Sequence, residues 1–240
     1  MGKEILKIHD LNSYYGKAHV LQEVSLTVNS LERVAVLGRN GMGKSTLLKS
    51  ILRLQDIRVE GDVLLNGETI TQAKTFEIAQ KGIAYVPQGW LLFPSLSVEE
   101  HLLMAYRSTE KNDKEKEWTP ERIFDLFPEI AARRKVSGTK LSGGEQQILA
   151  IGRALVSNPK ILLMDEPSEG ISTMVIDRII DLCHQLTEQG VSILMVEQNL
   201  ELALRVAQRI YVLVNGRIVH EGTAADFRLD KESQHQFLGV

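Results

Sequence analysis

Three continuous apolar runs stand out in the pattern of hydrophobic and polar positions along the chain. They cover residues 33–38 (RVAVLG), 160–165 (KILLMD) and 191–197 (VSILMVE). Runs that are apolar on both faces are typical of central strands in a parallel sheet. Helical stretches separate them at residues 44–52 and 173–190. This alternation of strand and helix predicts a doubly wound α/β core.

Two Asn-Gly pairs add a second signal, because this dipeptide favours the tight turn of a two-residue β-hairpin. Asn66-Gly67 lies within DVLLNGETI, and Asn215-Gly216 lies within IYVLVNGRIVHEG. The flanking segments are rich in residues that favour strands. The sequence therefore predicts an antiparallel β-sheet beside the parallel core.

Residues 98–157 have a mainly helical pattern. It is interrupted at residues 107–121 by the charged stretch RSTEKNDKEKEWTPE. We interpret this stretch as a solvated helix end and loop, since a run of charges usually lies on a solvated face. We expect one domain over residues 1–240, with a helical lobe over about residues 89–157.

Composition narrows the functional classes. The chain has 240 residues, 43% of them hydrophobic and 25% charged, and its net charge of −3 gives no general attraction to nucleic acid. No apolar run approaches the roughly 20 residues that span a bilayer, and the start lacks the apolar core of a secretory signal. Cys183 is the only cysteine, so an intrachain disulfide is excluded and we place it in a helix core. We expect a cytosolic protein that, if it works at a membrane, docks on another protein that spans it.

The first candidate site is GRNGMGKS, which directly follows a predicted buried strand and opens a predicted helix. Glycines let the backbone turn tightly and bring its N–H groups close to phosphate oxygens. Lys44 supplies a charge for the β- and γ-phosphates, Ser45 offers a hydroxyl to Mg²⁺, and the helix dipole favours the same anion. The predicted nucleotide-binding loop comprises Gly38, Arg39, Asn40, Gly41, Met42, Gly43, Lys44, Ser45 and Thr46.

The run ILLMDE supplies two carboxylates opposite this loop. Asp165 stands at the C-terminal end of a predicted strand, where it can hold Mg²⁺ in its outer shell. Glu166 follows directly and can orient the attacking water or act as its base. A surface turn is the alternative reading, since Pro167 ends the strand, but a buried strand that delivers both carboxylates to a phosphate loop disfavours it.

A second phosphate-binding element is predicted in LSGGEQQILAIGRAL. Ser142 is the expected helix N-cap and Glu145 the third helical residue, which together form a capping box. Gly143 and Gly144 leave the first turn bare, so its N–H groups face an anion. A capping box alone favours a well-capped helix with nothing bound. After a phosphate loop, LSGGE instead suggests a contact to the nucleotide of another subunit.

In combination, these motifs resemble those of the ATP-binding cassette family, and the resemblance covers essentially the whole chain. It implies a P-loop NTPase core with a mostly parallel sheet, an antiparallel β subdomain and a helical subdomain that carries the signature LSGGE. It also implies that the signature of one subunit closes over the γ-phosphate of ATP held by the other. Tyr15 corresponds to the aromatic residue that stacks on adenine, with Tyr14 as the second candidate, and Gln88 to the residue that touches Mg²⁺ and water.

Two positions depart from the family pattern. Gln198 stands where the family usually carries a histidine that contacts the γ-phosphate, and glutamine cannot become cationic near neutral pH. We therefore assign catalysis to Glu166, Gln198 and Lys44, with Glu166 as the base or water-orienting group and Gln198 as a neutral γ-phosphate sensor. Ser172 stands where the loop after Glu166 usually ends in aspartate, which puts the contacts of that loop across a dimer in question.

The runs EPSEGI and VEQN resemble those of ATPases from importers of branched-chain amino acids, urea and amides. The resemblance implies a homo- or heterodimer on the cytoplasmic face of the membrane, two permease subunits and an external solute-binding protein. An exporter ATPase for lipid or lipopolysaccharide is the alternative, followed by a soluble cassette ATPase. The LSGGE motif argues against a small-molecule kinase or GTPase.

The apolar segment after Gln88 allows two interpretations. Trp90, Leu91, Leu92 and Phe93 lie where the family receives helices of the permease, so they could form a docking groove. They could equally be core residues of the helical lobe. Exposure cannot be read from the sequence, so both stay open.

Overall fold

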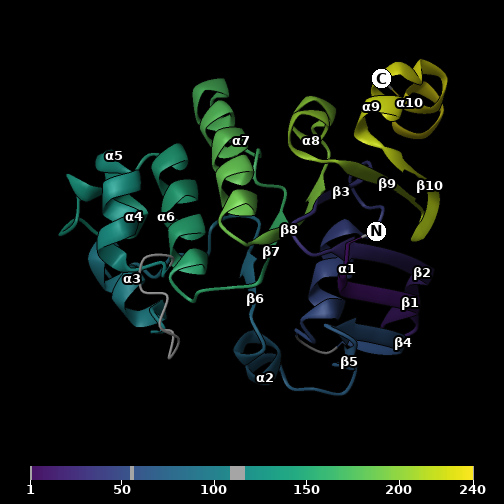
Figure 1. Ribbon diagram of the computed structural model, residues 1–240, viewed down its shortest axis with the longest axis horizontal. Helices are drawn as coiled ribbons and strands as arrows, with labels where there is room; N and C mark the ends of the chain where they lie inside the picture. The colour runs from purple at the N-terminus through teal and green to yellow at the C-terminus, as the bar shows by residue number, and fades with distance from the viewer. Residues whose placement is uncertain (1, 55–56, 109–116, 240) are drawn as a thin grey trace.

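The computed structural model describes residues 2–54, 57–108 and 117–239, and its strands form two sheets (Figure 1). The core sheet has the strand order β10-β9-β3-β8-β7-β6. All neighbouring pairs in it are parallel except β9 and β10. The core-sheet strands are β3 (Arg33–Leu37), β6 (Ile83–Val86), β7 (Ile161–Asp165), β8 (Ser192–Glu197), β9 (Arg209–Val214) and β10 (Arg217–Thr223). The predicted parallel α/β core is confirmed.

The second sheet is antiparallel and has the order β2-β1-β4-β5. Its strands are β1 (Glu4–Tyr15), β2 (Ala18–Asn29), β4 (Ile57–Leu65) and β5 (Glu68–Thr69). The turn at Asn66-Gly67 joins β4 to β5, as the hairpin signal predicts. The turn at Asn215-Gly216 instead joins β9 to β10, so this hairpin forms the edge of the core sheet. The long hairpin of β1 and β2 was not predicted, although Val24, Leu26 and Val28 alternate with polar residues there.

Helices fill the space between the sheets and cover the outer face of the core sheet. The helices are α1 (Lys44–Ile51), α2 (Thr75–Gln80), α3 (Val98–Ala105), α4 (Pro120–Leu126), α5 (Pro128–Ala131), α6 (Gly143–Leu155), α7 (Thr173–Glu188), α8 (Leu200–Val206), α9 (Ala224–Leu229) and α10 (Lys231–Leu238). Figure 1 shows α3 to α6 gathered at one end of the molecule, with α1 beside the antiparallel sheet at the other. In the described part of the chain, no helix combines the length and apolar character needed to cross a bilayer.

The two faces of β3 belong to different cores, which explains why its sequence is continuously apolar. Val34 and Val36 pack in one cluster with α1 and the antiparallel sheet. Ala35 and Leu37 pack in another with α6, α7 and α8. Successive side chains of a strand point to opposite faces, so a sheet covered on both sides needs apolar residues at every position. Cys183 is buried in the second cluster, as expected, and burial raises the pKa of its thiol to about 12.

The interpretation of residues 107–121 as a solvated stretch is wrong at its C-terminal end. Glu117 and Trp118 are buried, with 7% and 4% of their surface exposed. The backbone N–H of Trp118 donates to Oδ1 of Asn158 at 2.7 Å, and Thr119 caps α4. A buried indole anchors this part of the stretch against the helical group, which outweighs the local charge. Residues 109–116 lie outside the described residues.

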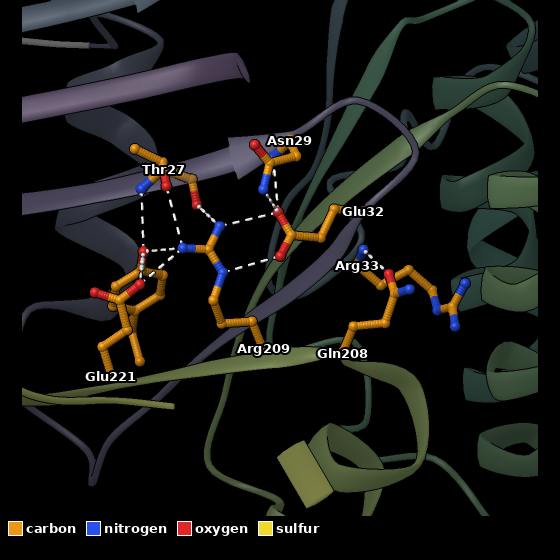
Figure 2. Close-up of polar contacts among 8 residues, drawn as sticks. Thr27, Asn29, Glu32, Arg33, Gln208, Arg209 and Glu221 are labelled. Atoms are coloured by element: carbon orange, nitrogen blue, oxygen red, sulfur yellow. Dashed lines mark hydrogen bonds and ion pairs between the residues drawn. The ribbon is translucent and has the colours of Figure 1, made fainter. Parts of the chain in front are cut away.

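An arginine network joins the edge of the core sheet to the antiparallel sheet (Figure 2). Arg209 makes a bidentate pair with Glu32, with both N–O distances at 2.9 Å, and it also donates to Glu221 at 2.8 Å. Its Nη2 donates to the backbone oxygen of Thr27 on β2 at 2.8 Å. Burial disfavours the charge, but the hydrogen bonds to Glu32 and Glu221 outweigh it and raise the pKa of Arg209. Planar bidentate pairs of this kind are among the stronger hydrogen-bonded contacts.

We expect Arg209→Ala to lower the free energy of unfolding by about 2–4 kcal/mol, because it leaves the mostly buried Glu32 carboxylate without its main partner. Urea unfolding followed by circular dichroism measures this. Arg217→Ala is the matched control, since its pair with Glu23 is exposed on both sides and its loss should cost less than about 1 kcal/mol. Equal losses in the two variants would contradict the prediction.

Candidate functional site

The phosphate loop connects the buried strand β3 to α1. Gly43 is the N-cap of α1 and has φ 103°, a left-handed conformation that favours glycine. A Cβ on Gly38 would lie 2.6 Å from the carbonyl oxygen of Leu213, so the loop can pass β9 only without a side chain there. The first turn of α1 has no acidic residue and no side-chain cap. Its N–H groups are therefore available to an anion.

Lys44 is buried beneath this loop, with 3% of its side chain exposed. Its Nζ donates to the backbone oxygens of Gly38 at 2.7 Å and Arg39 at 3.0 Å. It also lies 2.9 Å from Oε1 of Glu166. The structure thus brings two of the three predicted catalytic residues together as an ion pair, and all three N–H bonds of the ammonium have oxygen acceptors. A phosphate that took up this ammonium would have to replace some of these contacts.

Asp165 ends β7 opposite the start of α1. Its Oδ1 accepts from Ser45 Oγ at 2.8 Å, and its Oδ2 accepts from Tyr85 Oη at 3.0 Å. Burial raises the pKa of Asp165, while the hydrogen bonds from Ser45 and Tyr85 oppose that shift. Burial and the adjacent carboxylate also raise the pKa of Tyr85 far above its usual value, so its hydroxyl stays protonated and acts as donor. Tyr85 was not predicted from the sequence.

The oxygen atoms of Ser45 and Asp165 suit Mg²⁺, which prefers hard oxygen ligands and keeps several of its waters. Both lie at the mouth of the phosphate loop, where bound phosphate oxygens could complete the coordination. Gln88, the third predicted metal contact, is hydrogen-bonded to neither Ser45 nor Asp165 in the described structure. Its Nε2 donates instead to Oε2 of Glu169 at 2.8 Å. The structure therefore fits a cation at Ser45 and Asp165 and links Gln88 to the loop after Glu166.

Glu166 adopts φ 46°, which is uncommon outside glycine and asparagine. Its backbone N–H donates to the carbonyl of Val196 at 3.0 Å, and its own carbonyl accepts from Glu169 at 3.1 Å. These bonds hold the strained residue at the end of the strand. Strain of this kind is often found at functional sites.

A second residue that the sequence analysis missed is Glu197, which is 1% exposed at the end of β8. Its carboxylate accepts backbone N–H bonds from Ser168 at 2.9 Å, Gln198 at 2.9 Å and Asn199 at 3.0 Å. Its own backbone oxygen accepts from Gly38 at 3.2 Å. Burial raises the pKa of Glu197, and the backbone hydrogen bonds oppose that shift. Glu197 thus ties the phosphate loop, the loop after Glu166 and the exposed Gln198 to one point.

The predicted capping box is present at α6. Ser142 accepts from the N–H of Glu145 at 3.3 Å, and Glu145 accepts from the N–H of Ser142 at 2.8 Å. A close neighbour limits the size of residue 144, because a Cβ on Gly144 would lie 2.6 Å from Cγ2 of Val175, whereas a Cβ on Gly143 would meet only ordinary contacts, the nearest at 3.4 Å. Among the described residues, none of the hydrogen bonds of Ser142 reaches the phosphate loop of the same chain.

The two candidate adenine-stacking tyrosines differ in their surroundings. The ring of Tyr14 stacks on His19 at 4.3 Å and carries the guanidinium of Arg58 at 4.1 Å. Tyr15 ends β1 with 39% of its surface exposed, and in the described structure no aromatic or cationic side chain covers its ring. Of the two candidates, Tyr15 is therefore the better placed to stack on a planar base, and its role stays a prediction.

The segment after Gln88 divides between the two interpretations left open above. Trp90 and Leu92 are partly buried against the larger core, whereas Leu91 and Phe93 are 65% and 49% exposed. Arg153 on α6 fixes the segment, since it donates to the backbone oxygens of Trp90 and Leu91, each at 2.8 Å. Ser172, the second departure from the family pattern, is the exposed N-cap of α7 and makes no side-chain cap bond.

A family model described as ABC transporter matches residues 21–169, which is more than half of the chain. The chain is 40% identical over 235 residues to the "High-affinity branched-chain amino acid transport ATP-binding protein BraG" of Pseudomonas aeruginosa, covering 98% of this chain and all of that protein. It is 31% identical to the "Lipopolysaccharide export system ATP-binding protein LptB" of Escherichia coli K12, covering 98% of this chain and 97% of that protein.

Solved structures show the same fold. A nucleotide-free ATP-binding cassette from an ABC transporter superposes with a TM-score of 0.82 at 27% identity, covering 98% of this chain and 97% of that one. A dimeric cassette in a post-hydrolysis state, bound to ADP and Pi, superposes with a TM-score of 0.77 at 26% identity, covering 91% and 98%.

We expect Glu166→Gln to bind ATP about three- to tenfold more tightly than the wild-type protein. The carboxylate of Glu166 competes with phosphate for Lys44 and also repels the phosphate. The uncharged amide of glutamine has weaker effects of both kinds. Isothermal titration without a divalent cation measures binding without turnover. Glu188→Gln, a charge change at the exposed end of α7, should leave the affinity unchanged; equal or weaker binding by Glu166→Gln would contradict the expectation.

Proposed function

Because the chain belongs to the ABC transporter family of ATPases, we propose that it powers the import of branched-chain amino acids through a membrane permease. The observation that carries the ATPase part is the pair of half-sites. One is a complete phosphate loop with Asp165 and Glu166, and the other is the LSGGE helix start, whose exposed Ser142 makes no hydrogen bond to that loop in the described structure. The substrate class rests on the full-length similarity to BraG and on the runs EPSEGI and VEQN.

In the proposed reaction, the phosphates of ATP lie on the backbone N–H groups of residues 38–46, and the base stacks on Tyr15. Lys44 exchanges its bonds to the Gly38 and Arg39 carbonyls for phosphate oxygens. Glu166, released from Lys44, can then orient and deprotonate the attacking water. Mg²⁺ at Ser45 and Asp165 would neutralise charge that develops on the β- and γ-phosphate oxygens.

The second half of the site comes from a second copy or a similar subunit. Ser142 and Gly144 of the facing copy would donate to the γ-phosphate, so that ATP joins the two subunits. Gln198 would donate a neutral hydrogen bond to the same phosphate from a position fixed by Glu197. Loss of the γ-phosphate on hydrolysis removes the bridge and lets the subunits separate.

The proposed partner for docking is an apolar helix end of a permease subunit. A groove of about 350 Å³ runs between α1, α2 and the edge strand β6 on one side and α3 and α6 on the other. Its wall includes Leu54, Ala79, Ile83 and Met104, and Met104 is 57% exposed. Docking there would place the chain peripherally on the cytoplasmic face of the membrane, with a solute-binding protein on the far side of the permease.

An exporter ATPase is the second candidate, and the similarity to LptB supports it. The importer is favoured because identity to BraG is higher, at 40% against 31%, over a similar share of the chain. Urea and amides remain within the importer proposal as alternative solutes.

We expect Glu166→Gln protein to form dimers only when ATP is present, because ATP then bridges two half-sites without being hydrolysed. Adding Ser142→Arg should abolish this dimer by placing a bulky side chain at the proposed γ-phosphate contact. Size-exclusion chromatography with light scattering measures the mass. Ser97→Arg is the matched control, since Ser97 forms the same capping box with Glu100 on α3. Dimers that persist with Ser142→Arg, or vanish equally with Ser97→Arg, would refute the shared site.

We expect cells that lack this chain to lose uptake of radiolabelled leucine, and wild-type protein but not Glu166→Gln to restore it at least about tenfold. Urea and an aliphatic amide should be measured in parallel, since they test the alternative solutes. Normal leucine, urea and amide uptake together with a defect in lipopolysaccharide export would favour the exporter reading instead.

A further inference from the structure

Tyr85 connects two places that the proposed function uses separately. It lies on β6, the edge strand of the core sheet, whose single sheet neighbour β7 carries Asp165. Its hydroxyl donates to Oδ2 of Asp165 at 3.0 Å. Tyr85 is also among the residues that line the apolar groove, together with Met104 and Ala79. One tyrosine therefore touches both the groove and the carboxylate that is expected to bind the cation.

The two oxygens of Asp165 have different donors. Oδ1 accepts from Ser45, whose hydroxyl is itself expected at the cation, so this bond changes when the cation binds. Oδ2 accepts from Tyr85, whose hydroxyl has no expected role at the nucleotide. The Tyr85 bond can therefore fix the carboxylate plane in both states. Carboxylates at metal sites generally need such a partner to hold their orientation.

We propose that Tyr85 is a positioning residue for the Asp165 carboxylate, and that an apolar helix end of a permease subunit seated in the groove acts on Asp165 through this side chain. The second half of the proposal rests on the proposed docking of a permease. The route is distinct from Gln88, whose amide is bonded to Glu169. A ring with only two rotatable bonds suits this role, because displacement of β6 or contact with the ring moves the hydroxyl directly.

Tyr85→Phe keeps the ring and removes the hydroxyl, so it tests the first half. We expect the affinity for Mn²⁺, measured by electron paramagnetic resonance with a non-hydrolysable ATP analogue, to fall about three- to tenfold. The affinity for ATP without a divalent cation should stay within about twofold of the wild type. The matched control is Tyr106→Phe, because Tyr106 is also partly buried and donates to a carboxylate, that of Glu117, at 2.8 Å. It should change neither value.

Unchanged Mn²⁺ affinity in Tyr85→Phe would overturn the positioning role. An equal loss of ATP affinity without a cation would overturn it too, since the hydroxyl would then support the phosphate loop as a whole. A similar loss of Mn²⁺ affinity in Tyr106→Phe would assign the effect to general loosening of the fold.

The second half can be tested without a permease by filling the groove chemically. Met104→Cys introduces an exposed thiol there, and the native Cys183 is 1% exposed, so a bulky maleimide should label the groove alone. We expect labelling to change Mn²⁺ affinity at least about twofold when Tyr85 is present, and to have no effect in Tyr85→Phe protein. An equal effect in both backgrounds, or none in either, would overturn transmission through Tyr85.

These results are separable from the proposed function. If the label changes Mn²⁺ affinity as expected but leucine uptake does not depend on the chain, the Tyr85 route is retained and the importer is rejected. Leucine uptake that depends on the chain, without this coupling, would do the reverse.

Discussion

Parallel pairing of β3, β8 and β7 is the constraint on which the rest of the site depends. The three strands lie side by side in register, with Leu37 opposite Glu197 and Asp165 opposite Val196. Because their carboxyl ends meet at one edge of the sheet, the phosphate loop, the Asp165–Glu166 pair and the Glu197–Gln198 pair converge there. The Lys44–Glu166 ion pair is a consequence of this convergence. Burial of the strands on both faces fixes the position of this edge. The loops that leave it can therefore be short and still bring the site residues together.

Features that depend on the local sequence pattern could be predicted. Side chains whose hydrogen-bond partners lie far away in the sequence could not. Continuous apolar runs located the central strands, and glycine spacing located the phosphate loop, because both follow from the backbone needs of a few adjacent residues. Tyr85 and Asp165 are 80 positions apart, and nothing local to YVPQ distinguishes a tyrosine that binds a carboxylate from one that only packs. Glu197 was missed partly for the same reason: two of its acceptor bonds come from the adjacent residues 198 and 199, but the bond from Ser168, 29 positions away, and the burial of the carboxylate depend on the fold.

The same limit explains the errors at the charged stretch and at the N-terminus. The charges near Glu117 suggested solvent, yet Trp118 supplies enough apolar surface to bury that end, a balance that depends on the helices packed around it. In β1 and β2 the alternation is broken by irregularities in the strand pairing, which move side chains between faces and weaken the periodic signal. Long antiparallel strands with such shifts are harder to read than short, fully buried ones.

The balance of charge at the proposed site indicates that one chain alone does not supply the whole nucleotide-binding site. Asp165, Glu166 and Glu197 bring three carboxyl groups to the edge where we propose that the phosphates lie, whereas the ammonium of Lys44 is already bonded to Glu166 and to two carbonyl oxygens of the loop. A histidine at position 198 could add positive charge there, but Gln198 cannot. In the proposed site, a polyanion at this edge would therefore draw on the helix dipole of α1, on a divalent cation at Ser45 and Asp165, and on the N–H groups at the start of α6 from a facing subunit. Because none of the hydrogen bonds of Ser142 in the described structure reaches the phosphate loop of its own chain, the proposed site takes that last contribution from a second subunit, and neutral Gln198 increases the need for it.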